Sequence, residues 1–259
     1  MLDKYIISFS PLHIAAFCGK VDFYKHCVEK SCDLNPKEPI SGLSPLHFAA
    51  CHGKLEVCQF IIANLDDKNP RDKYHVSPLH EAAKFGHFAI CKLMIENLLN
   101  KNPGDVDGET PLHLATFEGY LDICKLITEN AKYKNPGDID GDTPLHNAAR
   151  SGHVDICNLI IEIIQDKNPG NENGLTPLHE ATWLGHLDVC TLIIENVQDK
   201  NPASNDGQTP LQLAAEKGHL DIYKLIIRKT RIQGNAQFYF FAFYFSVFLV
   251  IISVIRFSH

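Results

Sequence analysis

The chain has 259 residues, of which 45% are hydrophobic and 21% are charged, and its formal net charge is -7 at pH 7. This length is enough for two ordinary domains or for one elongated repeat domain. The acidic balance, together with the lack of a basic stripe beside stacking aromatic residues, excludes a typical nucleic-acid-binding protein. Residues 1–5 lack the basic region and long apolar run of a secretory signal, so we expect none.

The chain begins with a short apolar lead-in, residues 1–9, and one motif recurs from residue 10 onward. The motif is Ser/Thr-Pro-Leu, followed by His in the first six copies and by Gln212 in the seventh. The interval between copies is about 33 residues, and the first interval is longer than the others by one. The anchor residues are Ser10, Ser44, Ser77, Thr110, Thr143, Thr176 and Thr209. Two interpretations stay open for the lead-in: it covers the exposed face of the first copy, or it follows a cut in a longer array.

The fourth copy shows how each unit is expected to fold. Thr110 is a suitable N-cap, because its hydroxyl can accept a backbone N–H of the first turn, and Pro111 suits the first helical position. Gly119 is expected to end this helix in the left-handed conformation. A second helix follows from Leu121 and must stop before Pro136. Each unit is therefore predicted to be a pair of helices joined by a short turn.

Each predicted helix has about 8 to 12 residues, which is too short for stability in isolation. Stability must therefore come from the stacking of neighbouring units. A 33-residue period with the motif Thr-Pro-Leu-His-x-Ala is typical of ankyrin repeats, and the chain resembles the ankyrin-repeat family. This resemblance implies an all-α solenoid of stacked helix-turn-helix units with finger-like turns. The expected array covers residues 10–233, with repeats at 10–43, 44–76, 77–109, 110–142, 143–175, 176–208 and 209–233.

An Asn-Pro pair follows the second helix of six units, where related repeats commonly have glycine and a short apolar loop. Because proline disfavours a helical residue before it, we expect proline to end the second helix and that helix to run longer than usual. The pairs are Asn35-Pro36, Asn69-Pro70, Asn102-Pro103, Asn135-Pro136, Asn168-Pro169 and Asn201-Pro202.

The nine cysteines and fourteen histidines do not indicate catalysis, a cofactor or a metal site. Packed helices lie about 8–10 Å apart, whereas disulfide-bridged Cα atoms lie within about 7 Å. The cysteines that recur once per repeat are therefore expected to be buried reduced thiols, which favours the cytosol. They are Cys58, Cys91, Cys124, Cys157 and Cys190, with Tyr24 and Tyr223 at the same position of the end repeats.

The motif histidines are expected to bond back to the capping residue. We predict no catalytic residue, no cofactor and no metal.

Residues 238–255 form an apolar segment that carries no charge. A helix of this length would reach about 27 Å, close to the roughly 30 Å of a bilayer core. Arg228, Lys229 and Arg231 precede the segment and Arg256 follows it, which predicts a single-pass membrane anchor with the repeats in the cytosol. Two alternatives remain. One is a buried strand or aggregation-prone segment, and the other is an inaccurate chain end.

Variable positions on the first helices form the candidate partner-binding surface. The resemblance implies that such arrays bind proteins through this side of the stack and through the finger tips. Tryptophan and arginine are enriched at binding hot spots, and an acidic rim on the neighbouring turns favours a partner with a basic segment. The candidate residues are Phe85, Phe117, Arg150, Trp183, Asp140 and Asp142. As an alternative, the aromatic members simply cover the inner face of the stack.

The sequence therefore predicts a non-enzymatic, monomeric scaffold or adaptor for protein–protein interaction. We expect it to be held at the cytosolic face of a membrane by residues 238–255. Two other interpretations stay open: a fragment of a larger ankyrin-containing channel or signalling protein, and a soluble cytoplasmic adaptor.

Overall fold

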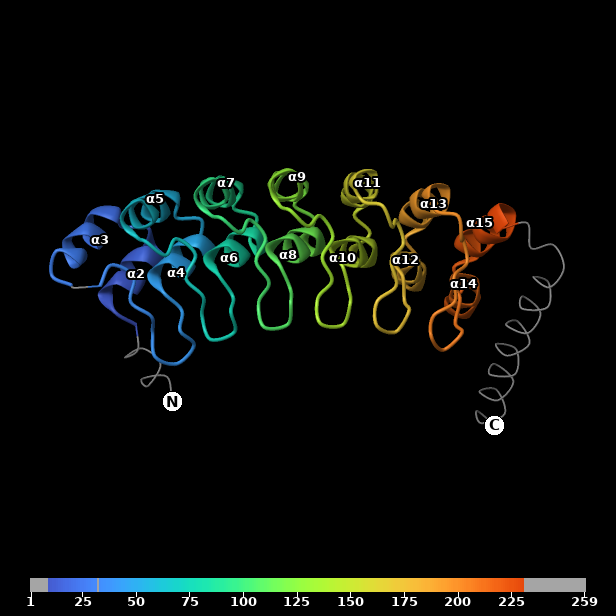
Figure 1. Ribbon diagram of the computed structural model, residues 1–259, viewed down its shortest axis with the longest axis horizontal. Helices are drawn as coiled ribbons and strands as arrows, with labels where there is room; N and C mark the ends of the chain where they lie inside the picture. The colour runs from blue at the N-terminus through green and yellow to red at the C-terminus, as the bar shows by residue number, and fades with distance from the viewer. Residues whose placement is uncertain (1–8, 32, 231–259) are drawn as a thin grey trace, which may run out of the picture. The chain divides into compact units, whose positions relative to one another are not determined.

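The computed structural model describes residues 9–31 and 33–230, which form fourteen α-helices. The chain divides into two compact units, Met1–Ile139 (unit 1) and Asp140–His259 (unit 2). In both units the helices follow one another in pairs, and each pair corresponds to one expected repeat (Figure 1). The prediction of an all-α array of helix pairs is therefore confirmed for the described residues.

Two predicted segments lie largely outside the described residues. They are the lead-in, of which the structure describes Phe9, and the apolar run 238–255. Among the described helices, none combines the length and the apolar character that a membrane span needs.

Unit 1 consists of two layers of helices. The first helices of the pairs pack side by side in one layer, and the second helices pack in the other. Long loops, which we call fingers, extend away from the second helices in Figure 1. The first helices are α2 (Pro11–Cys18), α4 (Pro45–Cys51), α6 (Pro78–Lys84) and α8 (Pro111–Glu118). The second helices are α3 (Val21–Val28), α5 (Leu55–Asn64), α7 (Phe88–Asn97) and α9 (Leu121–Asn130).

Unit 2 repeats the same arrangement with three helix pairs among its described residues. Its first helices are α10 (Pro144–Ser151), α12 (Pro177–Leu184) and α14 (Pro210–Lys217). Its second helices are α11 (Val154–Ile163), α13 (Leu187–Asn196) and α15 (Leu220–Thr230). Helix α12 packs between α10 and α14, and α13 packs between α11 and α15.

Every first helix begins with a hydrogen-bonded cap, in which the motif histidine is usually the third helical residue. In unit 1, Nδ1 of His47 accepts the backbone N–H of Ser44 at 3.1 Å. Because this nitrogen is an acceptor, the proton of the neutral ring is on Nε2, which donates to the carbonyl of Val76 at 3.1 Å. One imidazole thus joins the start of α4 to the next finger, and the expected structural role of these histidines is confirmed. In α14, the Gln212 amide oxygen replaces the ring and accepts the Thr209 N–H at 2.8 Å.

The second helices end earlier than the Asn-Pro pairs predict. Helix α9 ends at Asn130, and Ala131 is already extended, although the predicted stop lies at Asn135. The side-chain amide of Asn130 donates to the Leu126 carbonyl at 2.8 Å, so this asparagine bonds back to its own helix. The expectation that proline ends a longer second helix is therefore wrong.

The asparagine of the Asn-Pro pair instead caps the first helix of the following repeat. Oδ1 of Asn102 accepts the N–H of Leu112, at the start of α8, at 3.0 Å. Asn168 accepts the N–H of Leu178 at the same distance in unit 2. Since the first N–H groups of a helix have no partner inside it, this side chain supplies one from the preceding loop.

The core of each unit contains the predicted ladder of thiols. The five recurring cysteines, Cys58, Cys91, Cys124, Cys157 and Cys190, have 0% exposed surface. They are free, and burial raises the pKa of each of these thiols to about 12. Tyr24 occupies the same position in α3, is also fully buried, and donates its hydroxyl to the Leu34 carbonyl at 2.6 Å. The ladder therefore has a packing role.

Candidate protein-binding surfaces

Two of the predicted partner-binding residues lie on unit 1. Phe117 is on α8 and Phe85 directly follows α6, and their side chains are 49% and 46% exposed. The ammonium group of Lys84 lies 5.9 Å from the Phe85 ring centroid. Neither ring is buried between repeats, so both are accessible to a partner.

Unit 1 has a further apolar hollow that the sequence interpretation did not select. It has a volume of about 250 Å³ and is lined by Phe9, His13, Ile14, Phe17 and Phe48. Ile14 is 53% exposed and Phe17 is 48% exposed. The clue in the sequence was that Phe17 occupies a variable position of the motif, while Ile14 and Phe48 share the position directly after the motif histidine.

Trp183, the only tryptophan of the chain, lies on α12 in unit 2 and is 47% exposed. The ammonium group of Lys217 on α14 lies 3.3 Å from its ring centroid, which is a close cation–π contact. The ring also borders a hollow of about 250 Å³ whose other lining residues are Leu175, His179, Glu180, Gln208 and Leu213. Trp183 therefore combines an exposed aromatic face with an adjacent recess.

Arg150 and Asp142, both predicted to bind a partner, bind each other. Nη2 of Arg150 lies 2.6 Å from Oδ2 of Asp142, and Nε lies 2.9 Å from Oε2 of Glu180. The hydrogen bond to Glu180 raises the pKa of Arg150. Burial would raise the pKa of Asp142, but the hydrogen bonds from Arg150 and Asn171 lower it overall. The guanidinium is thus held between two carboxylates, and its first role is to join two repeats of unit 2.

The acidic residues of the fingers occupy two different environments. Asp140 is exposed, and its backbone carbonyl accepts the N–H of Glu172 at 2.9 Å. On unit 1, burial raises the pKa of Glu109, and the carboxylates of Asp105, Asp138 and Asp107 raise it further. The carboxylates near Glu109 therefore repel one another, and they create a negative potential at this finger.

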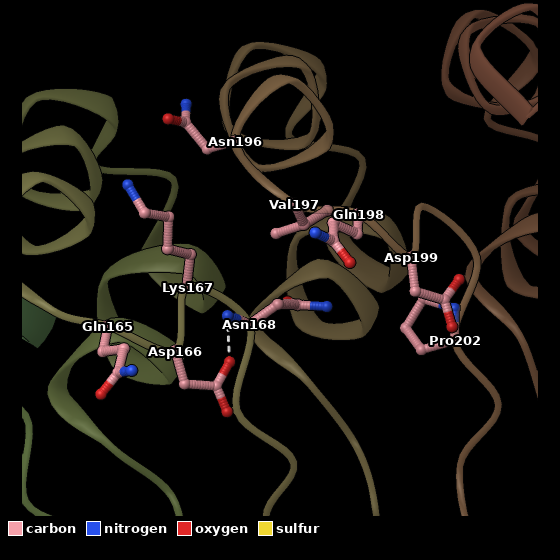
Figure 2. A pocket seen from close by; sticks show the side chains of 9 residues that line it. All are labelled: Gln165, Asp166, Lys167, Asn168, Asn196, Val197, Gln198, Asp199 and Pro202. Carbon is pink, nitrogen blue, oxygen red and sulfur yellow. Dashed lines mark hydrogen bonds between the residues drawn. The ribbon is translucent and has the colours of Figure 1, made fainter.

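A polar hollow of about 380 Å³ lies between the loops that follow α11 and α13 (Figure 2). It is lined by Gln165, Asp166, Lys167, Asn168, Asn196, Val197, Gln198, Asp199 and Pro202. The backbone N–H of Asn168 donates to Oδ1 of Asp166 at 3.1 Å inside this loop. None of the predicted partner-binding residues lines the hollow. Over the described part of the chain, no group of three or more His, Cys, Asp or Glu side chains is arranged to hold a metal ion.

Comparison with protein-family models places this geometry among known folds. Residues 3–72, 65–138 and 130–204 match the model described as ankyrin repeats (3 copies), and residues 206–235 match the model of a single ankyrin repeat. A search of curated proteins found no match to the chain. Because the family models cover most of the sequence and coincide with the helix pairs, the chain belongs to the ankyrin-repeat family.

Proposed function

We propose that this protein is a non-enzymatic scaffold that binds a protein partner through the exposed side of its first helices. Ankyrin repeats are protein-interaction modules, and folds of this kind leave specificity to their surface residues. The observation that carries the proposal is Trp183, which is half-exposed beside a hollow of about 250 Å³. An aromatic ring next to a recess is a common anchor of protein interfaces.

The recess beside Trp183 suits an apolar partner side chain with a polar neighbour. Leu175 and Leu213 contribute apolar surface to the recess. Beside them, Nε2 of His179 bonds to the backbone carbonyl of Gln208 at 3.1 Å. Lys217 covers the tryptophan ring in the free protein. A partner that stacks on this ring must therefore displace the lysine side chain or pack around it.

We further propose that the partner carries a basic segment and that the scaffold acts as a monomer. The net charge of -7 and the repelling carboxylates around Glu109 favour approach by a cationic segment. Attraction of this kind raises the association rate and is screened by salt. The association rate constant is therefore expected to fall as ionic strength increases.

The Trp183→Ala variant tests this binding role. Hot-spot truncations typically cost at least about 2 kcal/mol, so the variant should lose its captured partners or bind them about thirtyfold more weakly. The measurement is quantitative capture of cellular proteins on the immobilised full chain, followed by the dissociation constant for each captured protein. Ile163→Ala is the matched control, because Ile163 on α11 is 42% exposed but lies away from the recess. Equal capture by wild type and Trp183→Ala would contradict the proposal.

We propose in addition that residues 238–255 tether the scaffold to a membrane with the repeats in the cytosol. The support is the uncharged run over these positions, with Arg228, Lys229 and Arg231 before it. The tethered protein should remain in the membrane pellet after washing with alkaline carbonate. A chain that lacks residues 238–255 should move to the supernatant. Release of the full chain by carbonate would contradict the tether and favour a soluble adaptor.

A further inference from the structure

Lys217 holds its ammonium group on the face of the Trp183 ring. Trp183 lies on α12, and Lys217 is the last residue of α14, which packs beside α12. Nζ of Lys217 lies 3.3 Å from the ring centroid and 3.8 Å from Oε1 of Glu216. The side chain of Lys217 is only 30% exposed, so it lies against the ring and does not extend into solvent. The free protein therefore holds a cation between an aromatic face and a carboxylate.

The stacking of repeats brings these two positions together, but it does not require this pair of residues. In unit 1 the corresponding residues are Phe17 on α2 and His52 directly after α4. Their ring centroids lie 4.4 Å apart, so two aromatic rings make the same contact there. The cation over Trp183 is thus a property of this site and not of the repeat.

Two carboxylates lie near this cation, and they differ in what they can still bind. Oε2 of Glu216 accepts Nε2 of Gln208 at 3.3 Å, and the Glu216 side chain is 56% exposed. Glu180 lines the recess beside Trp183, and Arg150 already holds it at 2.9 Å. A carboxylate has about four acceptor positions. Glu216 can therefore accept further donors from a partner, whereas Glu180 mainly forms the wall of the recess.

Arginine is the partner side chain that is best suited to replace Lys217 on the ring. Its guanidinium is planar, is more weakly hydrated than an ammonium and stacks on aromatic faces. From this position its N–H groups can also donate to Glu216, because a fork of donors matches a carboxylate. A partner lysine would only exchange one ammonium for another, and a neutral side chain would bring Glu216 no cation.

Lys217 also limits how often the ring is free. A cation–π contact at a partly exposed site leaves the ring uncovered for about a fifth to a third of the time. The apparent affinity of a protein falls by the fraction of molecules that are able to bind. The lysine therefore weakens the binding of any side chain to the ring by about three- to fivefold.

We propose that the Trp183 ring binds an arginine of the partner, and that Lys217 is an internal competitor which occupies this site in the free protein. This inference rests on the proposed scaffold function and names the residue of the partner's basic segment that Trp183 recognises. An apolar neighbour of that arginine enters the recess beside Leu175 and Leu213. The competitor sharpens specificity, because only a side chain that binds the ring better than lysine displaces it.

The fluorescence of Trp183 tests the site directly, because this residue is the only tryptophan of the chain. The probe is the peptide acetyl-Gly-Leu-Arg-Gly-amide. A matched probe has citrulline, a neutral side chain of nearly the same shape, in place of arginine. Titration of the full chain should give a saturable change of emission with the arginine peptide and at least about fivefold weaker binding of the citrulline peptide. Equal affinities, or no saturable change at millimolar peptide, would overturn the proposal.

Two substitutions of Lys217 should shift the affinity for the arginine peptide in opposite directions. Lys217→Ala uncovers the ring and should strengthen binding about three- to fivefold. Lys217→Arg supplies a better internal competitor and should weaken binding at least about twofold. Equal affinities of these two variants would contradict the competitor role.

Lys224→Ala is the matched control for the change in charge. It removes the same charge from α15, where Lys224 is 72% exposed and lies 3.9 Å from Asp221. This variant should bind the arginine peptide as wild type does, and a gain equal to that of Lys217→Ala would reduce the effect to net charge. Thermal unfolding followed by circular dichroism checks that each variant is folded.

The results distinguish this inference from the scaffold proposal. If Trp183→Ala loses its captured cellular proteins while both Lys217 variants bind the arginine peptide equally, the scaffold role stands and the internal competitor is wrong. If the Lys217 variants shift peptide binding as expected while Trp183→Ala captures the same proteins as wild type, the arginine site stands and the scaffold role of this surface is wrong.

Discussion

Nε of Arg150 on α10 lies 2.9 Å from Oε2 of Glu180 on α12, so one ion pair joins two successive repeats of unit 2. The second ion pair of Arg150, to Asp142, gives the guanidinium two carboxylate partners. The side chain of Arg150 is 34% exposed and the carboxylates are 13% and 15% exposed. The pairs are thus protected from water more than an ordinary surface ion pair, which typically contributes about 0–1 kcal/mol.

We expect Arg150→Ala to lower the free energy of unfolding by about 1–2 kcal/mol, because two partly buried carboxylates lose their donor. Urea unfolding followed by circular dichroism measures the change. Lys229→Ala is the matched control, because its ion pair with Glu195 is 34% and 54% exposed and should contribute less. If both variants unfold at the same urea concentration, the Arg150 ion pairs contribute no more stability than the exposed Lys229–Glu195 pair.

The motif histidines predict a loss of stability in mild acid. Burial lowers the pKa of His47 and His80 to about 4, whereas the unfolded chain protonates them near 6.5. Between pH 4 and pH 6.5, the unfolded state therefore binds more protons than the folded state. Stability is therefore complete above pH 6.5 and is lost as the pH falls toward 4, by up to about 1.4 kcal/mol per pH unit for each histidine.

Urea midpoints at pH 7.5 and pH 5 test this pH dependence. The control is the double variant His47→Gln, His80→Gln, since Gln212 shows that glutamine can accept the same capping N–H. The variant should lose less stability than wild type between the two pH values. An unchanged wild-type midpoint would show that these rings do not titrate as their burial implies.

His75 is expected to be a strained residue. Its φ is 60°, in the left-handed region, where other fingers place Gly42, Gly108, Gly141, Gly174 and Gly207. A non-glycine residue costs about 1–2 kcal/mol in this region, and glycine loses about 0.5–1 kcal/mol of unfolded-state entropy. His75→Gly should therefore stabilise the chain by about 0.5 kcal/mol in urea unfolding.

The reverse substitution, Gly108→Ala, should destabilise the chain by more than about 1 kcal/mol. The φ of Gly108 is 78°, and a Cβ atom there would lie 3.0 Å from the Cα of Asp138. The same urea measurement serves both variants. A higher urea midpoint for Gly108→Ala than for wild type would contradict this, because it would mean that the finger backbone shifts to accept the new Cβ atom.

Cysteine reactivity should separate the buried ladder from the surface. Cys18 is exposed, whereas Cys58 and Cys124 are fully buried and burial raises their pKa to about 12. Only a thiolate reacts with iodoacetamide. At pH 8, peptide mass mapping should show rapid modification of Cys18 and modification of the ladder only after urea is added. Equal labelling rates in the native protein would contradict the packing role of the ladder.

Much of the fold could be predicted from the sequence, because the helix pairs are set by short-range rules that recur in every repeat. Thr110, Pro111 and Gly119 indicated the limits of α8 correctly, and the recurring cysteines indicated a buried position. The end of α9 was predicted incorrectly, because Ala131 is already extended, well before Asn135. The restriction before proline gives only the latest possible end of a helix.

The candidate surfaces were harder to predict. Arg150 was selected for its residue type, but its carboxylate partners come from positions 142 and 180, which depend on the stacking of repeats. Ile40, Val106 and Ile139 each stand four residues before a motif anchor, but only the structure shows that their side chains are about half-exposed.

The histidine bridges connect residues that are close in the chain: His47 reaches Val76, 29 positions later, and His87 reaches Cys51, 36 positions earlier. During translation, a repeat therefore obtains its stabilising contacts as soon as about one more repeat has left the ribosome. At about 5–20 residues per second, the roughly 33 residues needed emerge in about 2 to 7 seconds. Helix-pair folding with such local contacts is much faster than this interval. The nascent chain is thus expected to fold stepwise, and exposed apolar helix faces remain uncovered only briefly.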